Sequence, residues 1–97
     1  NMAVELSPEF QLSGDEVDLN DAERVKTLGL EIINGQDGPF KVGFAGLEQA
    51  NSIVVALMIC WHRHATLAGK TIEFSHLSKD LHNIVAFSGL TRVLQTS

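Results

Sequence analysis

Residues 49–64, QANSIVVALMICWHRH, contain nine consecutive apolar residues, from Ile53 to Trp61, directly after the polar pair Asn51 and Ser52. A helix at the surface of a soluble protein normally carries apolar side chains on one face only. The helix predicted here, from residue 52 to about residue 68, is instead apolar on every side over its first turns. Nine apolar residues are too few to span a membrane, which takes about 20. We therefore expect a helix that is covered on two sides within a soluble protein.

The helical repeat sorts these side chains into two stripes. One stripe can lie on a sheet, and the other, roughly opposite, needs separate cover. The first stripe contains Val54, Leu57, Met58, Trp61, Ala65 and Ala68, and the second contains Val55, Ile59, His62 and Thr66. Two alternatives stay open for the cover of Val55 and Ile59, which is either another element of the same domain or a partner protein. Ser52 is predicted to cap the helix with its hydroxyl group.

Strands are predicted on both sides of this helix, wherever apolar and polar residues alternate. Residues 4–14 contain two short extended pieces divided by Pro8, and residues 40–46 and 70–76 each contain one strand. Phe10 and Leu12 should face the core, as should the alternate residues of the later strands.

Two further helices are predicted. Asn20 is expected to cap the first, which ends near residue 33 and is weakened by Gly29, and Ser78 is expected to cap the last. The resulting order, β-β-α-β-α-β-α, predicts an α/β fold with a mixed, partly parallel sheet. The 97 residues are enough for one domain, residues 1–97, with a single core.

The charge of the chain argues against electrostatic binding of nucleic acid or of anionic lipid. The formal net charge is −5, and the seven Lys and Arg residues are scattered rather than clustered. Both kinds of partner require a basic patch. We expect neither nucleic-acid binding nor direct insertion into a membrane.

No catalytic, cofactor or metal site is predicted from the sequence. His62 and His64 point about 200° apart on a helix, so they cannot hold one ion together. Cys60 has no base close to it in the sequence, and a packed thiol is expected there. The acidic residues between positions 15 and 21 lack the spacing of a calcium loop, and a solvated loop is expected. An enzyme or a stand-alone ligand-binding domain is the least favoured class of function.

Several segments together resemble a known family. GLEQANS before the central helix, AGKTIEF after it and LSKDLHNIVAFSGLTRVL at the end are similar to the corresponding segments of STAS domains. The resemblance covers nearly the whole chain and is greatest for the MlaB or toluene-tolerance type, a subunit of Mla phospholipid-transport ABC systems. It implies a mixed sheet of about four strands with about three helices packed mainly on one face.

The resemblance also implies a role for the start of the central helix. Ser52 occupies the position of the family's conserved hydroxyl residue, which is phosphorylated in anti-sigma-factor antagonists and contacts the ATPase in MlaB. Ile53 and Val54 replace the small residues of that motif, and Asn51 or Ala50 replaces its aspartate. These departures favour a constitutive, largely apolar docking surface. The expected partner-binding residues are Asn51, Ser52, Ile53, Val55 and Ile59.

By this resemblance, the chain is expected to be a non-enzymatic protein that binds and regulates the ATPase of a phospholipid-transporting ABC complex. It would lie in the cytoplasm, held at the inner membrane through the transporter, and the isolated chain could form a homodimer through the same surface. The alternative is an anti-sigma-factor antagonist whose partner is an anti-sigma-factor kinase and whose switch is phosphate on Ser52.

Overall fold

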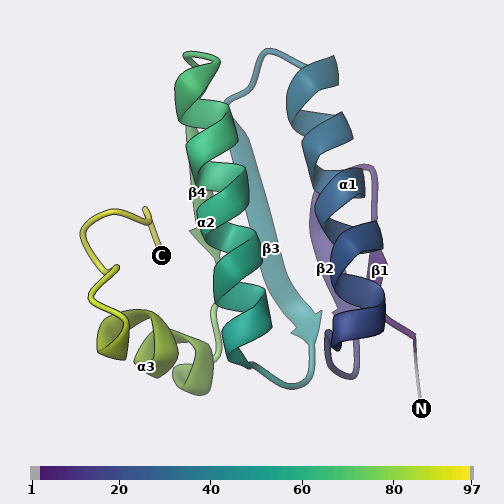
Figure 1. Cartoon of the computed structure of the whole chain (residues 1–97), viewed down its shortest axis with the longest axis vertical. Helices are drawn as coiled ribbons and strands as arrows, with labels where there is room; N and C mark the ends of the chain where they lie inside the picture. Colours follow the sequence, from purple (N-terminus) through teal and green to yellow (C-terminus); the bar gives the residue numbers. More distant parts are fainter. Residues whose placement is uncertain (1–2, 97) are drawn as a thin grey trace.

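The computed structural model describes residues 3–96, in which two long helices lie side by side across one face of a four-stranded sheet (Figure 1). The sequence predicted this order of elements, and the structure confirms it. The elements are β1 (Glu5–Leu6), β2 (Gln11–Gly14), α1 (Leu19–Gly35), β3 (Phe40–Leu47), α2 (Ser52–Leu67), β4 (Ile72–Ser75) and α3 (Lys79–Phe87).

The connectivity of the sheet explains why α1 and α2 share one face. The strands lie in the order β1-β2-β3-β4, with β1 antiparallel to β2 and the remaining pairs parallel. The two helical crossovers therefore step in the same direction along the sheet. Because such crossovers are right-handed, both helices pack on the same side. The short helix α3 lies beyond β4, beside the C-terminal segment (Figure 1).

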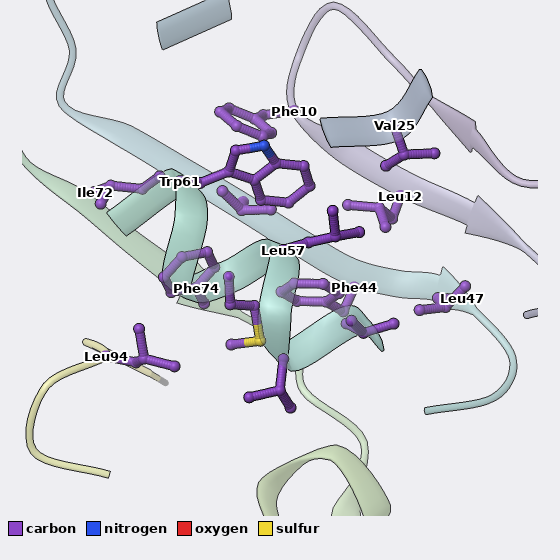
Figure 2. Close-up of a cluster of buried hydrophobic side chains, with 14 of the residues drawn as sticks. Phe10, Leu12, Val25, Phe44, Leu47, Leu57, Trp61, Ile72, Phe74 and Leu94 are labelled. Atoms are coloured by element: carbon purple, nitrogen blue, oxygen red, sulfur yellow. The ribbon is translucent and has the colours of Figure 1, made fainter. Parts of the chain in front are cut away.

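The core lies between the sheet and the two long helices. The side chains that were predicted to alternate inward, such as Phe10, Leu12 and Phe44, are buried there. Trp61 of α2 lies at the centre of this layer, with its ring edge-on to Phe10 at a centroid distance of 5.2 Å (Figure 2). The predicted inner stripe of α2 is confirmed apart from Ala68, which follows the end of the helix and is exposed.

Gly29 has a packing role that the sequence did not reveal. We expected it only to weaken α1, because glycine is a poor helix former. In the structure it is buried where α1 passes the indole ring of Trp61, and a Cβ atom at this position would collide with that ring. The indole nitrogen also donates a 3.1 Å hydrogen bond to the carbonyl oxygen of Lys26, one turn away on α1. The glycine therefore allows α1 and α2 to approach closely around the tryptophan.

Of the caps predicted for α1 and α3, the first is wrong and the second is confirmed. The cap of α1 is Asp18, whose carboxylate accepts a 3.0 Å hydrogen bond from the main-chain nitrogen of Asp21, and Asn20 lies inside the helix. Both residue types are good caps, and the extended backbone of Asp18 decides between them. Ser78 caps α3 as predicted, accepting a 3.1 Å hydrogen bond from the main-chain nitrogen of Leu81.

The other end of the helix pair is also tied together. Lys70, just after α2, donates a 2.6 Å hydrogen bond from its amino group to the carbonyl oxygen of Ile33 in the last turn of α1. A cation is favourable at this place, because the last carbonyl groups of a helix carry a partial negative charge. His64 of α2 makes a 3.1 Å contact with the side-chain oxygen of Asn34. No helix in residues 3–96 has both the length and the hydropathy needed to cross a membrane.

Candidate functional site

The start of α2 is held in place by Asn51, not by Ser52 as the sequence suggested. The side-chain oxygen of Asn51 accepts a 3.1 Å hydrogen bond from the main-chain nitrogen of Val54, which makes Asn51 the cap. Its side-chain nitrogen donates to the carbonyl oxygen of Val17 at 2.8 Å and to the carboxylate of Glu16 at 3.3 Å. An amide can do this because it carries an acceptor and two donors, whereas a hydroxyl group offers only one donor. The cap therefore also fastens the acidic loop to α2.

Ser52 is released from capping by this arrangement. It is the first residue of α2, and its side chain is exposed. Within residues 3–96, no hydrogen bond involves its hydroxyl group. The hydroxyl group thus faces the solvent at the positive end of the helix dipole, next to a rigid cap.

The other predicted contact residues differ in how far they are accessible. Val55 is only 4 % exposed and belongs to the core, while Ile53 and Ile59 are half-buried. The sequence left open whether the same domain or a partner protein covers Val55. The low exposure of this side chain shows that the domain itself covers most of it. α3 belongs to the same domain and packs against α2. Val55 can support a surface at the start of α2 from beneath, but it offers almost no area of its own.

The outward face of α2 contains a residue that the sequence analysis missed. Ala56 is exposed one turn after Ser52, and Arg63 is exposed two turns further along. Ala56 and Arg63 follow Ser52 by four and eleven positions, so all three residues lie on one side of the helix. Small side chains thus leave the first turns of α2 open to close approach. The signal was the spacing of Ser52 and Ala56, which the long apolar run obscured.

A shallow hollow adjoins this face between the starts of α1 and α2. It is lined by Glu16, Val17, Asp18, Leu19, Asn20, Asn51 and Ile53. Leu19, the first residue of α1, is 81 % exposed there, although leucine burial normally stabilises a fold. No pattern in the sequence marks Leu19, since only the tertiary structure brings it to the same hollow as Ile53.

A second, larger hollow shares the wall formed by Glu16 and Asp18. It is lined by Ala3, Val4, Asp15, Glu16, Asp18, Asp21, Glu48 and Gln49. The sequence predicted a solvated acidic loop here, and the folded chain adds Glu48 to it from the end of β3. A hydrogen bond with Asp15 and the charge of that residue raise the pKa of Glu48 above its ordinary value. Crowded carboxylates give this end of the molecule a negative potential.

Other candidate chemistry remains dispersed. Among residues 3–96 there is no group of three or more His, Cys, Asp or Glu side chains placed to hold a metal ion. Cys60 is half-buried on α2 rather than fully packed. His62 is half-buried too, and its Nδ1 atom is enclosed without a hydrogen-bond partner.

Solved structures with the same architecture define the class of fold. A chain of the Acinetobacter MlaFEDB complex in its ATP-bound Vtrans2 conformation superposes with a TM-score of 0.80 at 24% identity, over 98% of this chain and 99% of that one. A Thermotoga maritima protein described as an anti-sigma factor antagonist gives 0.75 at 9% identity, over 98% and 84%. An anti-sigma-factor antagonist (STAS) domain protein of Planctomyces limnophilus gives 0.73 at 12% identity, over 98% and 87%. The fold is that of a STAS domain.

The sequence itself narrows the class further. Residues 4–96 match the family described as "Mlab, STAS domain", which is nearly the full length of the chain. The chain belongs to this MlaB-type STAS family, as its resemblance in sequence indicated. A comparison with curated protein sequences gives no significant match.

Proposed function

We propose that this protein is a non-enzymatic subunit that binds the ATPase of an Mla-type phospholipid-transporting ABC complex and regulates it. The observation that carries the proposal is the family match over residues 4–96. By the resemblance in sequence, the exposed Ser52 at the start of α2 takes the position of the family's hydroxyl residue. The similar chain from the ATP-bound MlaFEDB complex supports the same kind of assembly. In such an assembly the protein would lie on the cytoplasmic side of the inner membrane, without entering the bilayer.

The geometry suggests how the docking surface works. Asn51 holds the first turn of α2 rigid, so that Ser52 is presented in one orientation. The small side chains of Ser52 and Ala56 let the backbone of a partner come close, and half-buried Ile53 adds apolar area beside them. Val55 belongs to the core of the domain, and Ile59 packs against that core, so the two anchor the helix from the inside. Rigid surfaces of this kind bind without a large entropic cost of ordering.

Regulation needs no chemistry from this domain. A protein that binds one conformation of an ATPase more tightly than another shifts the population towards the first. The proposed role therefore depends on differential binding to the partner's nucleotide states. ATPase activity of the partner, measured with and without this chain, reports the effect directly.

The decisive experiment is co-purification of the chain with its transporter from the native host. Ala56→Arg places a long charged side chain on the exposed face without entering the core, and Thr66→Arg makes the same change on an exposed position of the last turns of α2. We expect the ABC ATPase to accompany the wild type and Thr66→Arg, and to be lost with Ala56→Arg. Retention of the ATPase by a folded Ala56→Arg variant would contradict the proposed surface.

The second candidate is an anti-sigma-factor antagonist switched by phosphate on Ser52. It is favoured by the exposed hydroxyl group and by the two antagonist structures of similar fold. A phosphate group is tolerated at a helix N-terminus, but its charge would disrupt an apolar contact at Ile53. A mass increase on Ser52 after incubation with a cognate kinase, together with recovery of that kinase instead of the ATPase, would select this function.

The isolated chain is also proposed to dimerise through the same face, since a surface made for a partner is left uncovered. Light scattering on the wild type and on Ala56→Arg measures this. We expect any dimer to be lost in the variant, and a dimer that persists would have to use another surface.

A further inference from the structure

The shallow hollow between the starts of α1 and α2 brings hydrophobic and charged side chains side by side. Leu19 and Ile53 line the hollow, and Leu19 is 81 % exposed, so apolar surface is available at its mouth. Glu16 and Asp18 line both this hollow and the larger, acidic hollow, so they form the wall that the two share. A segment that crosses this wall passes from an apolar surface to an anionic one.

The acidic hollow concentrates charge to an unusual degree for this chain. Five of its twelve acidic residues line the hollow, namely Asp15, Glu16, Asp18, Asp21 and Glu48. No Lys or Arg is among the described lining residues. Arg24 offsets part of this charge, because its guanidinium group lies 3.3 Å from the carboxylate of Asp21.

Two of the other carboxylates accept hydrogen bonds from groups that carry no charge. Asp18 accepts from a main-chain nitrogen, and Glu16 accepts from the amide of Asn51. Glu48 and Asp15 instead share a hydrogen bond with each other, which places two acids in contact. Asp18 caps α1 and Asp21 lies in its first turn, but Asp15, Glu16 and Glu48 lie outside the first turn of any helix.

We propose that the ATPase partner inserts an apolar side chain between Leu19 and Ile53. A lysine or arginine of the partner, close to that apolar side chain, lies over the carboxylates of Glu16 and Glu48. Charge complementarity of this kind fixes the register of an interface and accelerates encounter. A guanidinium or ammonium group on a flexible stem suits the wide acidic hollow of about 760 Å³, in which the described residues include no group of ligands placed to hold a bare metal ion. The inference rests on the proposed function, because it names the chemistry of the partner at the same surface.

The test uses the purified Mla-type ATPase subunit of the native host and measures its dissociation constant with this chain across a range of KCl concentrations. Glu16→Lys/Glu48→Lys reverses two charges at the hollow. Glu31→Lys/Asp37→Lys makes the same change in net charge at exposed positions at and beyond the far end of α1. Thermal unfolding by circular dichroism shows whether both variants remain folded.

We expect wild-type affinity to fall with added salt, and Glu16→Lys/Glu48→Lys to bind about tenfold more weakly at low salt with a nearly flat salt dependence. The control pair should stay close to the wild type. Leu19→Ser tests the apolar half, and it should weaken binding at every salt concentration, because its loss is not electrostatic.

The outcomes separate the two proposals. If Ala56→Arg abolishes binding while Glu16→Lys/Glu48→Lys binds like the wild type, the docking surface stands and the proposed lysine or arginine contact is wrong. If both charge-reversal pairs weaken binding equally, the effect is one of net charge and the inference is again wrong. If wild-type chain does not bind the ATPase subunit, the proposed function fails and the inference fails with it.

Discussion

Asn51 and Val17 are joined by a 2.8 Å hydrogen bond, from the side-chain nitrogen of the first to the main-chain oxygen of the second, across 34 positions of sequence. The same asparagine caps α2. A single side chain thus fixes the start of α2 against the loop that precedes α1. Both linked residues line the shallow hollow between the starts of α1 and α2, and the exposed Ser52 follows Asn51 directly.

Replacing Asn51 by alanine should destabilise the fold, because the cap and the link to Val17 are lost together. We expect the free energy of unfolding to fall by about 2 kcal/mol. Ser52→Ala is the matched control on the adjacent position, and its expected effect is within about 0.5 kcal/mol. Urea denaturation followed by circular dichroism measures both. Equal losses in the two variants would show that Ser52 shares the capping role.

Gly29→Ala should also destabilise the protein, although alanine is the better helix former. The added Cβ atom meets the indole ring of Trp61, and overpacking of this kind costs about 1–3 kcal/mol. Gly35→Ala is the control, because a Cβ atom at the end of α1 has open space around it. We expect that variant to match or exceed the wild type in melting temperature. A stabilised Gly29→Ala variant would mean that the helices can separate without loss.

Trp61→Phe should lower the free energy of unfolding by about 2 kcal/mol, since it removes the hydrogen bond to Lys26 and leaves unfilled volume in the core. Phe87→Ala serves as the comparison, because Phe87 is 90 % exposed and should contribute little. The chain has one tryptophan, so its fluorescence should be blue-shifted when folded and move to longer wavelength on unfolding. A red emission maximum in the folded protein would contradict the burial of Trp61.

The contact between Glu48 and Asp15 predicts a pH dependence. The pKa of Glu48 is raised in the folded state, so the folded protein binds this proton more tightly than the unfolded chain does. The contribution to stability is present at acidic pH and is lost as the pH rises through that raised pKa. Glu48→Gln should therefore resemble the wild type in acid and become the more stable of the two towards neutral pH.

Melting temperatures of the wild type and Glu48→Gln, recorded from acidic to neutral pH, measure this difference. Glu31→Gln, on the exposed side of α1, controls for the loss of one negative charge. A constant difference between Glu48→Gln and wild type at every pH would show that the two carboxyl groups do not interact.

Much of the fold was predictable from local patterns. The alternation in residues 40–46 identified β3, because a strand that covers a core on one side shows a period of two. The helical spacing of Val54, Leu57 and Trp61 identified the buried side of α2 for the corresponding reason. These patterns are local, so they can be recognised without knowing which elements pack against the strand or the helix. The family could also be recognised from the sequence, because each segment that resembles it is a continuous stretch of the chain.

The site was less predictable, because its contacts join distant parts of the chain. Asn51 and Ser52 are both favourable caps, and only the position of the Val17 carbonyl decides for the amide. Val55 lies on the apolar run like its neighbours, and only the packing of the folded domain buries it. Leu19 and Ile53, 34 positions apart, line one hollow because two parallel helices begin at the same edge of the sheet. The sequence by itself determined the elements, their order and the family. The tertiary structure decided which residues at the start of α2 are accessible, since accessibility depends on neighbours that the chain brings together only on folding.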